Sequence, residues 1–185
     1  MPVNATNDKL GWIAPEFSLL DVSGKILPFN EICGKNGTVI AFICNHCPYV
    51  IAIAERLSFE AKELKKLSIN MIAIMSNDVE QYPEDSFDNM KLFAKKYDFE
   101  FSYLYDETQE VAKGYGAVCT PDIFGFNSSL ELMYRGRIDS GVMNSDTKKI
   151  DRELFFAMNK IKNDGVGPKD QLNSFGCSIK WKTNE

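Results

Sequence analysis

The chain has 185 residues, of which 44% are hydrophobic and 25% are charged, and its formal net charge is −5. These values are typical of a globular protein and argue against intrinsic disorder. The length favours one domain over residues 1–185, with a core over about residues 10–163 and a tail over residues 164–185. The acidic balance argues against a nucleic-acid or anionic-membrane partner, because both require a basic face, and we expect neither.

The amino terminus has no basic start and no apolar run of signal-peptide length. The longest apolar stretch, residues 38–44, has the length of a strand and not of a membrane span. We therefore expect a soluble, cytoplasmic protein. In a reducing compartment, five cysteines suggest redox chemistry or metal binding, not a structural disulfide framework.

The first part of the chain predicts a hairpin, a buried strand and a helix. Residues 17–20 and 26–29 flank a Ser23-Gly24 turn, the pattern of a β-hairpin. Residues 38–43 are β-branched, aromatic and apolar on both faces, as expected for a central parallel strand. From Pro48 to about residue 67 the apolar period becomes helical, and proline suits the first turn of a helix.

The rest of the chain continues this alternation. We expect strands at residues 70–75 and 101–105, a helix at 85–97, a hairpin of 122–126 and 131–137, and a last helix capped by Asp146 and carrying Ile150. Asp106 is expected to cap a short helix ending near Gly114 or Gly116, with Gln109 as its capping-box partner.

This order of elements predicts an α/β fold. Strands that alternate with helices form a parallel sheet covered on both faces, and the closing hairpin adds antiparallel strands. We therefore expect a central mixed sheet flanked by helices, with an N-terminal β-hairpin and a C-terminal tail.

The main chemical signal is Cys44-Asn45-His46-Cys47, between the strand at 38–43 and the helix at Pro48. The positive end of a helix and its unpaired N–H groups stabilise a thiolate, so they lower the pKa of a cysteine below about 8.5. The motif therefore offers a nucleophile and a resolving thiol together, and protonated His46 would favour the thiolate further. The alternatives are inert buried cysteines or zinc, which needs about four ligands where the motif offers only one local pair. We expect no resident metal or cofactor.

A second signal is Cys119-Thr120-Pro121-Asp122, just before the strand predicted at 122–126. A proline at the start of a strand is permitted, so the segment can be a simple strand boundary. The other interpretation is a cis Thr120–Pro121 bond.

Together these motifs resemble the thioredoxin superfamily, and most closely its peroxiredoxin-like branch (redoxins related to AhpC/TSA). The resemblance spans roughly residues 10–182 and rests on Cys44-Asn-His-Cys-Pro-Tyr49, Ser76-Asn-Asp78, Tyr82-Pro-Glu-Asp-Ser86, Asp106-Glu-Thr-Gln109, Tyr115-Gly-Ala-Val-Cys-Thr-Pro-Asp122, Tyr134-Arg-Gly136 and Gly176-Cys-Ser-Ile-Lys-Trp181. It implies a thioredoxin fold in which a cis-proline loop faces the CxxC motif. Cys44 would then be the attacking thiol, Cys47 the resolving thiol and Pro121 the cis-proline. Asn45, His46 and Thr120 would be supporting residues.

The resemblance implies a thiol–disulfide oxidoreductase that acts on protein or small-molecule disulfides, with a thioredoxin- or glutathione-type electron donor. His46 directly before the second cysteine is similar to protein disulfide isomerase and the periplasmic disulfide oxidase. A cation beside the thiolate stabilises the reduced form and makes the disulfide a stronger oxidant. Plain thioredoxin instead has a Trp before its first cysteine, where this chain has Ile43.

One alternative is a thiol-dependent peroxidase with Cys47 as the peroxidatic thiol. Cys44 then occupies the position where peroxiredoxins have Thr or Ser, and the position of their arginine falls near Pro121. These departures argue against a fast peroxidase, although Arg135 or Arg137 could substitute. Another alternative is a non-enzymatic binding module.

Three cysteines lie outside the motif. We expect Cys119 and Cys177 to be small buried residues; the alternative is a second redox pair, or a relay that resolves a Cys44–Cys47 disulfide. Cys33 is assigned no role. Asn77 and Asp78 follow the strand at 70–75 and could line a pocket, but a turn is the favoured interpretation.

Overall fold

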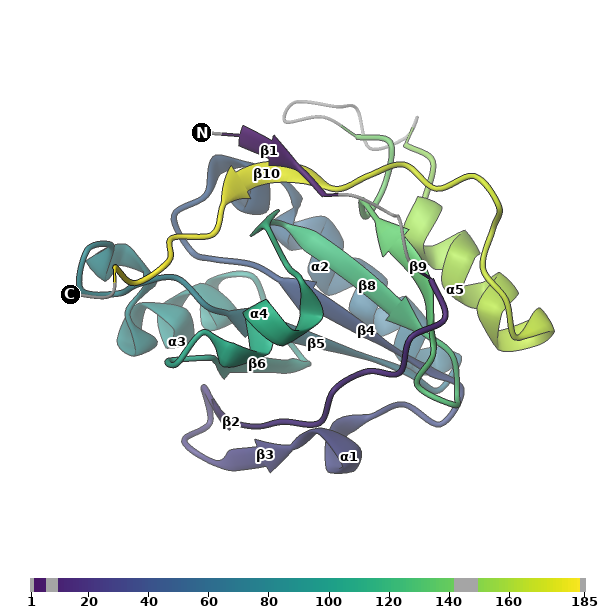
Figure 1. Ribbon diagram of the computed structural model, residues 1–185, viewed down its shortest axis with the longest axis horizontal. Helices are drawn as coiled ribbons and strands as arrows, with labels where there is room; N and C mark the ends of the chain where they lie inside the picture. Colours follow the sequence, from purple (N-terminus) through teal and green to yellow (C-terminus); the bar gives the residue numbers. More distant parts are fainter. Residues whose placement is uncertain (1, 6–9, 142–149, 184–185) are drawn as a thin grey trace.

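The computed structural model describes residues 2–5, 10–141 and 150–183. Their largest sheet has seven strands in the order β3-β2-β6-β5-β4-β8-β9 (Figure 1). The strands are β2 (Ser18–Asp21), β3 (Ile26–Pro28), β4 (Gly37–Phe42), β5 (Ile69–Met75), β6 (Ser102–Tyr105), β8 (Asp122–Phe126) and β9 (Leu132–Gly136). β4, β5 and β6 are parallel, and the hairpins β2–β3 and β8–β9 pair antiparallel at the two sides. The predicted mixed sheet and both predicted hairpins are therefore confirmed.

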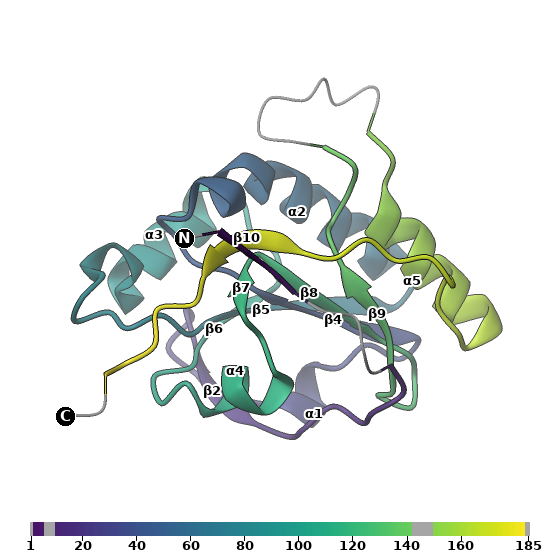
Figure 2. The ribbon, with the colours of Figure 1, turned by 45° about the horizontal axis from the view of Figure 1, so that its top comes forward.

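Helices cover both faces of this sheet (Figure 2). α2 (Pro48–Lys66), α3 (Phe87–Lys96) and α5 (Glu153–Asp164) lie on one face, and the short helices α1 (Phe29–Ile32) and α4 (Glu110–Tyr115) lie on the other. β4 shows why this arrangement forms. Val39 and Ala41 point into the core under α2, while Ile40 and Phe42 point into the core on the other face. The strand is therefore buried on both sides, as its sequence predicts.

The tail forms a strand that the sequence did not predict. β10 (Phe175–Ser178) lies between β1 (Pro2–Asn4) and β7 (Cys119–Thr120) in a separate three-stranded antiparallel sheet. Figure 1 shows the yellow tail beside the purple N-terminal strand, next to the start of β8. This sheet places β10 beside the Thr120–Pro121 loop and, through the contact of Phe175 with Tyr49, beside the start of α2.

Two predicted helix starts are wrong. Asp85 ends a 3-10 turn, η1 (Pro83–Asp85), and α3 begins only at Phe87. The last helix begins at Glu153, so Ile150 precedes it. Asp146, its predicted cap, lies outside the described residues.

The start of α4 differs from the predicted capping box. The helix begins at Glu110 with Gln109 as its N-cap residue, so Asp106 is not the N-cap, although its Oδ2 accepts a hydrogen bond from the Ala112 N–H at 2.9 Å. Gln109 is not its capping-box partner. Its side-chain nitrogen donates instead to the carbonyl oxygens of Ser76 (2.7 Å) and Lys180 (2.8 Å). Gln109 therefore ties the tail to the end of β5.

Candidate functional site

The two cysteines of the motif meet the Thr120–Pro121 loop in the interior of the protein. Cys44 follows β4, and Cys47 is the residue directly before α2. Cys44 Sγ lies 3.3 Å from Thr120 Oγ1, and Cys47 Sγ lies 3.2 Å from the Thr120 carbonyl oxygen. The Thr120–Pro121 bond is cis, as the resemblance implies. Both cysteines have 0% exposure.

The two thiols have opposite pKa shifts. The pKa of Cys47 is lowered to about 4, first because the Cys44 thiol donates a hydrogen bond to its sulfur, and against the effect of burial. The Cys177 thiol, the Cys177 backbone and the Val50 backbone N–H at the start of α2 add further hydrogen bonds. The pKa of Cys44 is raised well above 9.0, first by its hydrogen bond to Cys47, then by burial and the charge of Asp85.

As a thiol, Cys47 can donate to the Thr120 carbonyl oxygen. As a thiolate it accepts from several donors, so the charged form is favoured. This order of acidity is the reverse of the order implied by the resemblance to thioredoxin, in which Cys44 attacks. The negative charge is favoured on Cys47 first because the Cys44 thiol donates to it, and its place at the N-terminus of α2 acts in the same direction. For Cys44, the hydrogen bond to Cys47, burial and the charge of Asp85 all oppose ionisation.

Asp85 holds the loop between the two cysteines in place. Its Oδ1 accepts hydrogen bonds from the backbone N–H groups of Asn45 (2.7 Å) and His46 (3.3 Å). Its Oδ2 is 2.7 Å from His46 Nδ1 and accepts a hydrogen bond from Asn77 Nδ2 at 2.8 Å. Asp85 has 0% exposure. The sequence gives no local sign of this role, although Asp85 lies in one of the segments that carry the resemblance, Tyr82-Pro-Glu-Asp-Ser86.

The supporting residues of the motif have defined partners. Asn45 accepts a hydrogen bond from the Tyr103 hydroxyl at 2.9 Å and donates one to the Glu84 carbonyl oxygen at 3.1 Å. The His46 ring stacks on Tyr82 with centroids 5.4 Å apart. Because protonated His46 would pair with Asp85, its charge would be largely neutralised by that carboxylate. His46 is thus a weaker source of positive charge for the thiolate than expected.

The residues after β5 connect the site to the tail. Asp78 Oδ1 accepts a hydrogen bond from the Glu80 N–H at 3.0 Å, so Asp78 does form the predicted turn. Asn77 precedes this turn, and its side chain also bridges two other segments. Its Nδ2 donates to Asp85, while its Oδ1 accepts from the Lys180 N–H at 2.9 Å.

The three other cysteines lie in three different environments. Cys177 is half-buried and pairs with Thr120 in the register of β10 and β7. Cys119 is buried, its thiol donates to the Pro121 carbonyl oxygen at 3.4 Å, and burial raises its pKa. Cys33 donates to the Phe29 carbonyl oxygen at 3.0 Å, and burial raises its pKa to about 11. Of the candidate auxiliary thiols, Cys177 is the one whose strand partner, Thr120, lies directly against Cys47.

The arginines considered for a peroxidase both have carboxylate partners. Arg135 Nη2 lies 2.8 Å from Asp122 Oδ2. Arg137 makes two hydrogen bonds to Glu153, at 2.6 and 2.7 Å. Neither of these ion pairs involves a cysteine.

Cys44, His46 and Asp85 also group three possible metal-ligand atoms within 4.8 Å of one another. Both oxygens of Asp85 already accept hydrogen bonds, however, so a cation there would have to displace those donors. The site as built therefore fits thiol chemistry better than metal binding.

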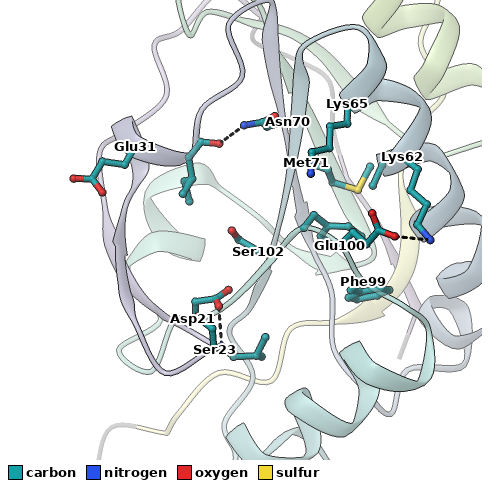
Figure 3. Close-up of a pocket in the computed structure, with 14 residues that line it drawn as sticks. Asp21, Ser23, Glu31, Lys62, Lys65, Asn70, Met71, Phe99, Glu100 and Ser102 are labelled. Atoms are coloured by element: carbon teal, nitrogen blue, oxygen red, sulfur yellow. Dashed lines mark hydrogen bonds and ion pairs between the residues drawn. The ribbon is translucent and has the colours of Figure 1, made fainter.

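Two pockets lie at different ends of the sheet. One of about 490 Å³ is lined by residues including Asp21, Lys62 and Phe99 and includes no cysteine (Figure 3). Its Lys62 pairs with Glu100, and the Asn70 side chain donates to the Ile32 carbonyl oxygen. Another pocket, of about 460 Å³, borders the site and is lined by Tyr49, Ile53, Pro121, Ile138 and Phe175 among others. Within the described residues, no helix has the length and apolarity needed to cross a membrane.

Comparison with known proteins shows the family of the chain. Residues 10–155 match the AhpC/TSA family. Peroxiredoxin Q, chloroplastic, from Populus jackii is 31% identical over 117 residues, which make up 62% of this chain and 49% of the relative. The chain thus spans about half the length of the first curated relatives that it matches.

Solved structures show the same architecture. An uncharacterized conserved protein from Geobacillus kaustophilus is 40% identical, with a TM-score of 0.93 over 100% of this chain and 98% of that chain. The thioredoxin domain of a thiol-disulfide oxidoreductase from Bacteroides vulgatus is 15% identical, with a TM-score of 0.58 over 69% of this chain and 87% of that chain. At this identity the second likeness shows the fold alone, and it confirms the expected thioredoxin fold.

Proposed function

Because this chain belongs to the AhpC/TSA family, we propose that it is a thiol–disulfide oxidoreductase in which Cys47 attacks and Cys44 resolves. The observation that carries the proposal is the position of Cys47 directly before α2, with Cys44 and Cys47 both against the Thr120–Pro121 loop. The pKa of Cys47 is lowered to about 4, first by hydrogen bonding from Cys44, which favours the thiolate that the attack requires, and Cys44 supplies the second thiol.

The reaction then has two balanced steps. The Cys47 thiolate attacks one sulfur of a disulfide substrate, which gives a mixed disulfide on Cys47 and releases the first substrate thiol. Cys44 loses its proton and attacks the Cys47 sulfur, which releases the second substrate thiol and leaves a Cys44–Cys47 disulfide. Two electrons pass from the protein to the substrate, and a thioredoxin- or glutathione-type donor restores the dithiol. Both steps are reversible, so the Cys44–Cys47 disulfide can equally oxidise a substrate dithiol, and the redox potential of the pair decides the direction.

The test is single-turnover reduction of 2-hydroxyethyl disulfide by the reduced protein and its variants. In Cys47→Ser the first substrate thiol should not be released, because the remaining thiol of the pair, Cys44, has a raised pKa and is not ionised at neutral pH. Cys44→Ser should retain that release, because the Cys47 thiolate is still present, but it cannot form the Cys44–Cys47 disulfide. Cys33→Ser, which changes a thiol outside the site, should match the unchanged protein. Full activity in Cys47→Ser would overturn the proposal.

A thiol-dependent peroxidase is the second candidate. It is favoured by the family and by the lowered pKa of Cys47, since a thiolate is also the nucleophile toward a peroxide. The carboxylate partners of Arg135 and Arg137 weigh against it, because these arginines are then engaged elsewhere. We expect hydrogen peroxide to oxidise Cys47 no faster than it oxidises an ordinary cysteine that is ionised to the same extent. A rate orders of magnitude above that of free cysteine would favour the peroxidase.

A further inference from the structure

A third sulfur lies beside the buried pair. Cys177 pairs in register with Thr120, whose carbonyl oxygen is 3.2 Å from Cys47 Sγ. The side chain of Thr120 faces the pair, because its Oγ1 lies 3.3 Å from Cys44 Sγ, and side chains directly opposite in an antiparallel ladder share one face. β10 therefore holds the Cys177 thiol on the side of the buried pair, in agreement with its contribution to the lowered pKa of Cys47.

The fold keeps β10 in this place through several contacts. β10 lies between β1 and β7, and beyond its end the Ile179 N–H donates to the Val118 carbonyl oxygen at 3.2 Å. At Gly176, a side-chain Cβ would lie 2.0 Å from the Thr120 carbonyl oxygen, so only glycine allows the observed approach. The position of Cys177 thus follows from specific packing of the strand.

The three sulfurs differ in access to solvent. Cys44 and Cys47 have 0% exposure, whereas Cys177 is only half-buried. An external thiol can therefore meet Cys177 without the opening of the interior that the other two require.

We propose that Cys177 is a third redox-active thiol, which exchanges a disulfide with Cys47 and connects the buried pair to thiols in solution. This inference rests on the proposed function of that pair. In the oxidised protein, Cys177 loses its proton and attacks the Cys47 sulfur. The Cys44–Cys47 bond breaks, the Cys47–Cys177 bond forms, and Cys44 takes up a proton.

External thiols complete the transfer. A first thiol, for example glutathione, attacks the Cys177 sulfur and releases Cys47 as a thiolate. A second thiol attacks the glutathione sulfur of the mixed disulfide on Cys177, which restores the Cys177 thiol and releases glutathione disulfide. Two electrons thus pass from two external thiols to the protein.

The electrostatics around Cys177 agree with this sequence. Its pKa is raised to about 11, first by burial and then by the hydrogen bond to Cys47 and the charge of Cys47, while the charge of Lys180 lowers it. When Cys47 is part of a disulfide, its charge is gone and Lys180 remains. Cys177 is then easier to ionise at the step in which it must attack.

The first test uses Cys44→Ser, in which Cys47 has lost its usual partner. The variant is oxidised with glutathione disulfide, quenched in acid and alkylated, and its disulfides are mapped by peptide mass spectrometry. We expect a Cys47–Cys177 disulfide in most molecules, and an unchanged yield when Cys33→Ser is added. Adding Gly176→Ala changes no further thiol, but its methyl group should push β10 away from Thr120. The yield of the Cys47–Cys177 disulfide should then fall by about tenfold. Glutathione on Cys47 with Cys177 fully alkylated would overturn the inference.

The second test measures reduction of the oxidised protein by glutathione. Cys177→Ser should slow the loss of the Cys44–Cys47 disulfide by about tenfold, since the exposed thiol is missing, and Cys33→Ser should not. An unchanged rate in Cys177→Ser would contradict the relay. Failure of the proposed function would give a different result, because the unchanged protein would then form no Cys44–Cys47 disulfide. The Cys47–Cys177 cross-link in Cys44→Ser does not depend on that disulfide, so the two failures can be told apart.

Discussion

Among single residues, Asp85 supports the cysteine motif most directly. It is a fully buried carboxylate with hydrogen bonds from both backbone N–H groups between the cysteines and from two side chains. The spacing of Cys44 and Cys47 could be recognised in the sequence because the chemistry is local. The role of Asp85 could not be recognised in the sequence, because Asp85 lies in η1 and contacts the loop after β4 only in the folded chain. In the sequence, an Asp at this position resembles the start of a helix.

The importance of this carboxylate can be measured with Asp85→Asn. The amide cannot accept from all four donors, so we expect the free energy of unfolding in urea to fall by about 2 kcal/mol. The pKa of Cys44 should also fall, because the charge of Asp85 contributes to its elevation. Asp88→Asn, at an exposed position on α3, is the matched control and should change little. Equal stability of the two variants would show that Asp85 is not needed.

The acidity of Cys47 predicts a distinctive pH dependence. With a pKa of about 4, Cys47 remains a thiolate at neutral pH. The difference in thiolate ultraviolet absorbance between the reduced protein and Cys47→Ser should therefore be flat from about pH 6 to pH 8. In Cys44→Ala the main hydrogen-bond donor is lost, so the pKa of Cys47 should rise.

The sign of the effect on stability follows from the same shift. The pKa of Cys47 in the folded state lies below its ordinary value of 9.0. Its contribution to stability is therefore fully present above about pH 9 and is lost as the pH falls toward about 4. An absorbance difference that rose with an apparent pKa near its ordinary value would contradict this account.

At the scale of elements, the sequence predicts the long helices and the central strands well, and the small sheet poorly. The predicted elements have clear patterns: the long helices have a helical apolar period, and β4 is a continuous apolar run that is buried on both faces. β1, β7 and β10 have two to four residues each, too few for any period. They form because they pair with one another beside the Thr120–Pro121 loop.

The tail should depend on Gln109, which is buried and reaches two segments. Its side chain donates to the carbonyl oxygens of Ser76 and Lys180 and accepts from the Lys182 N–H at 2.8 Å. In Gln109→Ala we expect faster hydrogen exchange in β10, because these bonds hold the residues that follow it. Gln81→Ala, at an exposed position, is the control. Unchanged exchange of β10 in Gln109→Ala would mean that pairing with β1 and β7 is sufficient.

At the scale of the whole molecule, the fold favours the reduced state of the cysteine pair. α2 provides the N-terminal N–H groups, and the loop before β8 and the tail surround the two sulfurs. The stabilised thiolate of Cys47 exists only when the pair is reduced. Closing a disulfide removes that stabilisation, so the disulfide should be a comparatively strong oxidant. The compartment, the electron donor and the substrate stay predictions from the sequence.

A redox titration in glutathione buffers, with trapping of thiols and mapping of disulfides by mass spectrometry, tests the central claim most directly. We expect one reversible transition between the reduced protein and a form with a Cys44–Cys47 disulfide. Its potential should lie closer to the value of about −120 mV of a strong oxidant than to about −270 mV, that of thioredoxin. If Cys44 and Cys47 could still be alkylated at every glutathione ratio, no disulfide would have formed and the account would be contradicted.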